Sequence, residues 1–173
     1  VNTDHGFLLG EHDWWGKNDM PDFNEIAHTP LFLYDPVSGI RGERRDALTQ
    51  TIDLAPTLLD FFGKPIPPDM RGRSLLPVIR ENAPGHAYAL FGYFNGPINI
   101  TNGQYVYMRA RVDDAVQMHQ YTMMPTAMDN RLPVEQLRQA ELAPPFPFTK
   151  GCPMFRIPVP AQNGKLPRGG HRL

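Results

Sequence analysis

The chain has 173 residues, with 17 lysines and arginines against 18 aspartates and glutamates, which gives a net charge of −1. This balance excludes the basic footprint of a protein that binds nucleic acid or an anionic membrane surface. Hydrophobic residues make up 41% of the chain, and no apolar run approaches the ~20 residues of a membrane helix. We therefore expect no nucleic-acid partner and no membrane partner. The single cysteine, Cys152, excludes an intrachain disulfide.

The first part of the chain has the pattern of α/β structure. Residues 1–3 predict the end of a strand. Residues 4–24 are rich in Gly, Asp, Asn and aromatic side chains and predict a long loop, which in a compact domain is usually functional. The apolar run at 30–34 predicts a buried strand of a largely parallel sheet, because strands covered on both faces are continuous hydrophobic runs.

Two helices are expected after that strand. The first covers 53–62, with Asp53 as its N-cap and Pro56 in its third position, where a proline costs no intrahelical hydrogen bond. Apolar residues surround most of this helix, so we expect it to be well buried. The second covers 74–80 and repeats the arrangement, with Ser74 as its N-cap.

The pattern changes near residue 82, where we place a domain boundary. Residues 1–82 are expected to form an α/β domain, and residues 83–173 a small antiparallel β subdomain with a proline-rich tail. The short strands of this subdomain are expected at 88–93, 97–101, 104–109 and 117–123.

Three local signals complete the prediction for the second part. Asn102-Gly103 between two of the strands predicts a two-residue hairpin turn. A short helix is expected at 133–140, which begins with a proline. From Pro144 onward prolines recur every few residues, and we expect extended surface chain.

The loop at 4–24 gathers side chains that bind cations and side chains that bind anions. Asp4 and His5 place a carboxylate beside an imidazole, and His12 and Lys17 follow in the same loop. This composition is typical of a metal-assisted site that acts on an anionic ester. The alternative is an aspartate that caps a turn beside a solvated histidine.

Two of these residues have a second interpretation. Trp14 and Trp15 precede Lys17, and bulky rings there predict a partly desolvated ammonium, which binds an anion more strongly than an exposed one. Alternatively, the rings only anchor the loop and Lys17 is a surface lysine. His12 is expected either to donate to an oxygen of a bound anion or to support the residues that do.

Several segments, in their order and spacing, resemble the C-terminal part of type I sulfatases. The resemblance covers roughly residues 1–110 and weakens through the tail. It implies a sulfuric ester hydrolase, an α/β fold that is the C-terminal part of an alkaline-phosphatase-like fold, and a small antiparallel β-sheet subdomain. The segments are Thr3 to His12 (Thr-Asp-His-Gly-Phe-Leu-Leu-Gly-Glu-His), Lys17, Thr29 to Phe32, Asp53 to Leu59, Met70 to Pro77 and Asn102 to Arg109.

The resemblance also implies a set of ligands. Family members bind one divalent cation, usually Ca²⁺. Asp4 matches one cation ligand, and His5 matches the neighbouring position, at which many members carry Asn and some carry His. Lys17 matches the lysine that contacts the sulfate. The implied substrate is a sulfated small molecule or carbohydrate, and a periplasmic or secreted location is compatible with the family.

One part of the family pattern is missing from this sequence. Sulfatases attack with a formylglycine made from the first residue of a Cys/Ser-x-Pro-Ser/Ala-Arg motif, and no segment here has that pattern, Cys152-Pro153 included. The further carboxylates of the cation site are missing too. We therefore expect a truncated, inactive portion of a sulfatase. Its open sheet edge and apolar faces are expected to be covered by self-association or by a missing N-terminal portion.

Two alternatives remain open at this point. The Asp-His-Gly tripeptide also occurs in superfamily phosphatases and phosphodiesterases with two transition metals, which need further His and Asp ligands. The second alternative is that the chain is a non-catalytic structural fragment with the same fold. Lys17 and the pattern from Asp53 to Pro77 favour the sulfatase interpretation.

Overall fold

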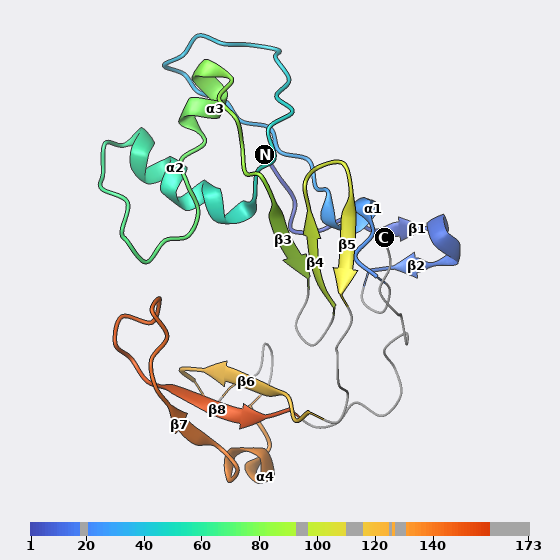
Figure 1. Ribbon diagram of the computed structural model, residues 1–173, viewed down its shortest axis with the longest axis vertical. Coiled ribbons are helices and arrows are strands. Elements are labelled where there is room, and N and C mark those ends of the chain that lie inside the picture. Colours follow the sequence, from blue (N-terminus) through green and yellow to red (C-terminus); the bar gives the residue numbers. More distant parts are fainter. Residues whose placement is uncertain (18–20, 93–96, 110–115, 125, 127–130, 160–173) are drawn as a thin grey trace. The chain divides into compact units, whose positions relative to one another are not determined.

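The computed structural model describes residues 1–17, 21–92, 97–109, 116–124, 126 and 131–159 (Figure 1). The chain divides into two compact units. Unit 1 comprises residues 1–66, 71–111 and 165–173, and unit 2 comprises residues 67–70 and 112–164. The strands expected between residues 88 and 109 therefore group with unit 1, and the domain boundary near residue 82 stays a prediction. No described helix is long and apolar enough to cross a bilayer.

The part of unit 1 that the structure describes combines short helices with two small antiparallel sheets (Figure 1). One sheet is a two-stranded ribbon, β1-β2, and the other has three strands in the order β3-β4-β5. The elements are β1 (Leu8–Leu9), the 3₁₀ helix η1 (Glu11–Asp13), β2 (Trp15–Gly16), α1 (Asn24–Ala27), the 3₁₀ helix η2 (Thr51–Asp53), α2 (Leu54–Phe61), α3 (Leu76–Glu81), β3 (Ala89–Gly92), β4 (Ile98–Thr101) and β5 (Val106–Arg109).

The three strands predicted between residues 88 and 109 are present, but the hairpin between β4 and β5 has a longer loop than the predicted two-residue turn. The register pairs Thr101 with Val106, so four residues connect the strands. The side-chain oxygen of Asn102 accepts the backbone N–H of Tyr105 at 2.8 Å. Asn102 therefore acts as a turn former through its side chain, and the Asn-Gly pair is only part of the loop.

The buried strand predicted at 30–34 is wrong for the described structure. Leu31 forms a single antiparallel bridge with Asn2, and no parallel partner strand lies beside it among the described residues. The side chains of Phe32 and Tyr34 are about 70% exposed, at 69% and 70%. An apolar sequence alone does not bury a segment, because burial also requires a neighbouring element that covers it.

The two predicted helices are α2 and α3. Pro56 is the third residue of α2, as predicted, but Pro77 is the second residue of α3, whose N-cap is Leu75. The hydroxyl of Ser74 accepts the backbone N–H of Leu76 at 3.2 Å, so it still contributes to that helix end.

The prediction that α2 is well buried is only partly correct. Pro56 and Thr57 are buried, whereas Leu58 is 59% and Phe62 is 68% exposed. The helix buries the side that carries Pro56 and Thr57. Its other apolar side has no cover within the described part of unit 1.

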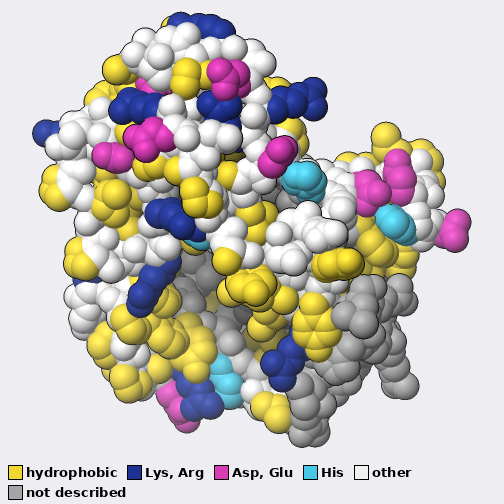
Figure 2. Space-filling view, turned by 45° about the horizontal axis from the view of Figure 1, so that its top comes forward, with side chains coloured by type: hydrophobic (Ala, Val, Ile, Leu, Met, Phe, Trp, Pro, Cys, Tyr) yellow, Lys and Arg dark blue, Asp and Glu magenta, His cyan; other side chains and the backbone are white. Residues whose placement is uncertain are grey.

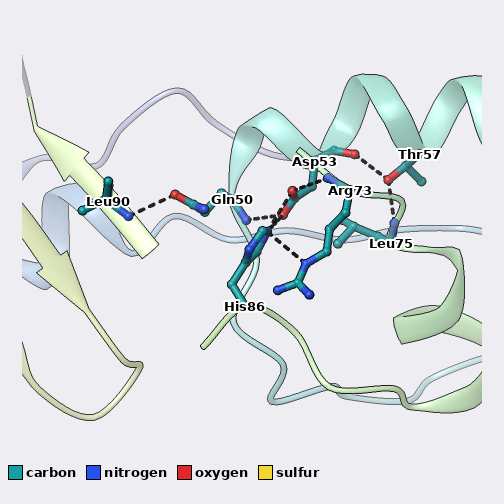
Figure 3. A network of polar contacts seen from close by, with 7 residues as sticks. All are labelled: Gln50, Asp53, Thr57, Arg73, Leu75, His86 and Leu90. Carbon is teal, nitrogen blue, oxygen red and sulfur yellow. Dashed lines mark hydrogen bonds and ion pairs between the residues drawn. The ribbon is translucent and has the colours of Figure 1, made fainter. Parts of the chain in front are cut away.

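The carboxylate of Asp53 links three segments of unit 1 (Figure 3). It is fully buried and accepts the backbone N–H groups of Gln50 and Arg73 at 2.8 and 3.0 Å. His86 Nε2 lies 2.9 and 2.8 Å from its two oxygens. Asp53 is the N-cap residue of α2 by position, but its side chain makes no cap hydrogen bond. The predicted cap therefore binds neighbouring segments and not its own helix.

A hydroxyl extends this network into α3. Thr57 Oγ1 donates to the backbone oxygen of Asp53 at 2.5 Å and accepts the N–H of Leu75 at 2.8 Å. Gln50 Oε1 accepts the N–H of Leu90 at the edge of β3, as Figure 3 shows. Polar contacts thus join the start of α2 to the entry to α3, where they are buried, and to β3, where the contact is exposed.

The described residues of unit 2 form one antiparallel sheet and one short helix. The sheet order is β6-β8-β7, so the last strand in the chain lies in the middle. The predicted strand and helix near 117–123 and 133–140 are present in shortened form. The elements are β6 (His119–Thr122), α4 (Val134–Leu137), β7 (Glu141–Ala143) and β8 (Met154–Pro158).

The expectation of extended surface chain from Pro144 onward is therefore wrong for residues 154–158, which form the central strand of this sheet. Ile157 of β8 is fully buried and Met154 is 8% exposed. The prolines around this segment argued against a strand, although the segment has apolar residues at the positions that are buried. The last part of the predicted tail, 160–173, lies outside the described residues.

Large hydrophobic side chains lie at the surface among charged ones, as Figure 2 shows. In unit 1 they include side chains of the 30–34 segment and of α2. They are Phe32, Leu33, Tyr34, Leu58 and Phe62.

We predict that replacing Asp53 by Ala lowers the free energy of unfolding by about 3 kcal/mol or more, because three partly buried donors lose their fully buried acceptor. Urea denaturation followed by circular dichroism measures the change. Asp60→Ala, which removes an exposed carboxylate of the same helix, is the matched control and is expected to change stability by less than about 0.5 kcal/mol. Equal effects of the two variants would contradict a special role for the Asp53 network.

We also predict that the isolated chain associates in solution, because apolar side chains exposed together favour contacts with another surface. Light scattering at increasing concentration is expected to give a mass above that of the monomer. The double variant Phe32→Ser, Phe62→Ser is expected to lower that mass. A monomer of the original chain at every concentration would contradict the prediction.

Candidate active site

The structure brings together three of the four residues predicted for the site. His5 Nε2 lies 3.4 Å from Asp4 Oδ2 and 2.5 Å from Lys17 Nζ. The Asp4 side chain is 82% exposed and that of His5 is 35% exposed. A carboxylate, an imidazole and an ammonium therefore meet at one accessible point of unit 1.

The contacts of His5 indicate which of its two ring nitrogens carries the hydrogen. Nδ1 lies 2.9 Å from the backbone oxygen of Gly6. A carbonyl oxygen only accepts, so Nδ1 carries the hydrogen and a neutral His5 has its lone pair on Nε2. Lys17, which has only donors, faces that lone pair. His5 is thus oriented with the nitrogen that is able to bind a cation toward Asp4 and Lys17.

The pKa of the Asp4 carboxyl is held below its ordinary value. The largest cause is its own backbone N–H, followed by the charge of His5 and then by the N–H of His5, which donates to Asp4 Oδ1 at 3.0 Å. All three favour the ionised carboxylate. Asp4 is therefore in the form that a cation requires.

His12 is not joined to the other three residues by any described contact. Its Nε2 lies 3.2 Å from Glu25 Oε2, and its ring stacks on Phe23 with a centroid distance of 3.8 Å and an interplanar angle of 13°. His12 is bound to the start of α1. Of its two predicted roles, only the supporting one has contacts in the structure.

The turn that carries His12 has an unusual backbone. His12 and Asp13 have φ angles of 56° and 60°, in the left-handed region that non-glycine residues rarely occupy. Glu11 supports the turn, since its carboxylate accepts the N–H of Leu9 at 2.6 Å. This hydrogen bond is the largest cause that lowers the pKa of Glu11. Glu11 is therefore occupied within the turn.

Gly6 permits the close approach of this loop to α1. Its N–H donates to the backbone oxygen of Ile26 at 2.8 Å. A Cβ atom at Gly6 would lie 1.6 Å from the backbone oxygen of Glu25, which no side chain can occupy. The glycine that follows the Asp-His pair is thus required by packing, independently of any ligand.

The expectation that tryptophans desolvate Lys17 is wrong. Trp14 packs against the buried pair Leu8 and Ile26, whereas Trp15 is 73% exposed, and Lys17 itself is exposed. The rings point to different environments because they are adjacent in an extended segment, where successive side chains alternate. Trp14 anchors the loop, as the alternative interpretation has it.

The described residues contain no group of three or more His, Cys, Asp or Glu side chains that could hold a metal ion. Asp4 and His5 alone offer one carboxylate and one imidazole, while calcium takes six to eight oxygen ligands. The pair fits part of a cation site and does not make a complete one.

Comparison with known proteins decides the family. The family described as N-sulphoglucosamine sulphohydrolase, C-terminal, matches residues 10–130. The chain belongs to this family. The resemblance to the C-terminal part of sulfatases is thereby confirmed, together with a mixed α/β structure that contains small antiparallel sheets.

Individual relatives agree with this assignment. An N-acetylglucosamine-6-O-sulfatase of Bacteroides thetaiotaomicron is 39% identical over 79 residues, which are 46% of this chain and 14% of that protein. An arylsulfatase of Clostridium perfringens is 38% identical over 82 residues, 46% of this chain and 17% of that protein. A multifunctional alkaline phosphatase superfamily protein of Trinickia caryophylli is 34% identical over 83 residues, 47% of this chain and 16% of that protein.

The matches cover about one sixth of each relative's own length. Membership of the family therefore rests on the family match over residues 10–130, and these relatives agree with it. The activity of the whole protein and its substrate belong to the proposal below.

Sequence reasoning missed the residues that support the loop of this sulfatase-family chain. Phe23 and Glu25 contact His12, and Ile26 contacts Gly6. The available signal was Phe-Asn-Glu at the start of a short helix, which gives no indication of a partner 13 residues earlier.

We predict that Gly6→Ala displaces the loop from α1, because the added methyl group overlaps the Glu25 carbonyl. Either the free energy of unfolding falls by about 3 kcal/mol or more, or the Gly6–Ile26 hydrogen bond is lost while the fold remains. Fast amide exchange at residue 6 would report the second outcome. Ala27→Gly, a change of the same size at the end of α1, is the control for helix destabilisation. An unchanged exchange rate at residue 6 would show that the close approach is not maintained in solution.

Proposed function

We propose that this chain carries part of the cation- and sulfate-binding site of a sulfuric ester hydrolase. The contact of Lys17 Nζ with His5 Nε2, with Asp4 Oδ2 beside it, is the observation that supports this best. Membership of the sulfatase family supports the reaction class, sulfate ester hydrolysis. The names of two relatives, an N-acetylglucosamine-6-O-sulfatase and an arylsulfatase, support a sulfated carbohydrate or sulfated small molecule as substrate.

Asp4 and His5 would contribute ligands to one divalent cation, which we propose to be Ca²⁺. Asp4 is the stronger candidate, since calcium prefers oxygen donors and this carboxylate is exposed and ionised. The other ligands would have to come from outside the described residues. When bound, the cation would polarise an oxygen of the sulfate ester.

Lys17 and a cation compete for the same lone pair. The nitrogen of His5 that would bind the cation is the one that accepts a hydrogen bond from Lys17 in this structure. Cation binding at His5 would therefore release the ammonium of Lys17. The free ammonium, exposed and close to Asp4, would then donate to the sulfate oxygens.

His12 has a supporting role in this proposal. Its imidazole is stacked on Phe23 and bonded to Glu25, so it fixes the far end of the turn between His5 and Lys17. The distance between the two halves of the site depends on that turn.

A phosphatase or phosphodiesterase is the second candidate, because the Trinickia caryophylli relative is described as a multifunctional alkaline phosphatase superfamily protein. Such two-metal sites need more His and Asp ligands than the described residues bring together. Parallel assays with an aryl sulfate and an aryl phosphate separate the two candidates.

We predict that Lys17→Ala in the natural protein lowers kcat for an aryl sulfate roughly a hundredfold or more, by removal of a donor to the developing charge. Lys64→Ala, the loss of another exposed lysine outside the loop, is the matched control and is expected to leave kcat unchanged. Retention of full activity by Lys17→Ala would contradict the proposed role.

The 173-residue chain by itself provides the background for this assay. Its sequence has no Cys/Ser-x-Pro-Ser/Ala-Arg motif from which a formylglycine nucleophile is made, so we expect no turnover. Metal-dependent hydrolysis by the pure chain would show that a different nucleophile acts, and the proposed division of the site would be wrong.

A further inference from the structure

A buried polar pair joins the three-stranded sheet to the segment before α1. Asn99 lies in β4, between β3 and β5 (Figure 1), and is fully buried. Its Nδ2 donates to Asp22 Oδ2 at 2.9 Å across 77 residues of chain, and Asp22 is only 9% exposed. Both partners are polar in a place where burial costs free energy unless hydrogen bonds compensate it.

The residues that follow Asp22 contact the site loop through polar and ring contacts, in addition to the apolar packing of Ile26 against Leu8 and Trp14. Phe23 stacks on His12, Glu25 binds the His12 imidazole, and the backbone oxygen of Ile26 accepts the N–H of Gly6. A displacement of Asp22 would move these three groups together, because α1 is one short helix that starts directly after Phe23.

We propose that Asn99 is a positioning residue of the active site, whose buried hydrogen bond to Asp22 fixes the segment 22–26 and, through it, the loop from Asp4 to Lys17. Asn99 acts through Asp22 and not on a ligand. That this loop belongs to an active site rests on the proposed function, whereas the contacts from Asn99 to the loop do not depend on it.

The chemistry of the pair favours a specific role over simple packing. The Oδ1 atom of Asn99 is buried and has no hydrogen-bond partner among the described residues. A leucine would remove this unpaired oxygen, but it would also deprive the buried Asp22 carboxylate of its donor. Burial raises the pKa of the Asp22 carboxyl, and the Asn99 N–H opposes that effect. The amide is therefore explained by its contact with Asp22.

The stacking of His12 on Phe23 gives a spectroscopic signature for the test. At a centroid distance of 3.8 Å the Phe23 ring current shifts the His12 imidazole protons upfield. In Asn99→Leu of the full chain, we expect these NMR signals to move toward the values of a free histidine. Amide exchange at Gly6 is expected to become roughly tenfold faster or more, as for loss of a hydrogen bond to a charged group.

Two further variants separate positioning from general destabilisation. Asp22→Asn retains an acceptor for Asn99 and offers its own N–H to Asn99 Oδ1, so the His12 signals should stay in place. Thr57→Val removes the buried acceptor of the Leu75 N–H, in another network of unit 1, and should lower stability without moving the His12 signals. If Asn99→Leu does not fold, Asn99→Ala tests the same contact with a smaller change.

Unchanged His12 signals and Gly6 exchange in a folded Asn99 variant would overturn the positioning role. Equal shifts in Thr57→Val would overturn it too, since the signals would then report stability alone. Titration of the original chain with sodium sulfate, followed at the His5 signals, tests the proposed function separately. Absence of any sulfate-dependent shift would count against the sulfate site while the Asn99 result stands by itself.

Discussion

The buried carboxylate of Asp53 is the interaction on which the arrangement of unit 1 depends. It accepts hydrogen bonds from Gln50 and Arg73 and binds His86, so segments up to 33 residues apart converge on one side chain. Its full burial makes every one of these donors necessary, because an unsatisfied carboxylate is far more costly inside a protein than at its surface. The helix α2 begins at the residue after it, which ties the helix start to the same point.

Two other buried carboxylates connect distant parts of the same unit, with different partners. Asp35 binds the guanidinium of Arg80 at 2.7 Å, and that hydrogen bond is the largest cause that lowers the pKa of Asp35. Asp22 binds the neutral amide of Asn99, and burial raises its pKa. The sign of the shift follows the partner: a cation favours the charged carboxylate, whereas desolvation beside an amide disfavours it.

These polar connections carry weight because the apolar core is small. The largest fully buried hydrophobic side chains of the described part are Leu8, Leu75 and Ile157, and many large hydrophobic side chains remain exposed. Directional hydrogen bonds determine relative orientation more sharply than a small apolar contact does. The site loop is bound to the α1 segment by one backbone hydrogen bond, one imidazole–carboxylate contact and one ring stack, together with the apolar packing of Leu8 and Trp14 against Ile26.

The sequence by itself determined the family, the helix near α2, the strands β3 to β5 and the grouping of Asp4, His5 and Lys17, because these depend on residues close together in the chain. Tertiary structure alone decided which segments are buried, how the strands pair and which distant groups meet. The burial of the 30–34 run requires a neighbouring element, and β8 became a central strand only by pairing with β6 and β7. The roles of Asp22, His86 and Asn99 arise from partners 33 and 77 residues away, and a linear pattern carries no record of which distant group will satisfy a buried polar atom.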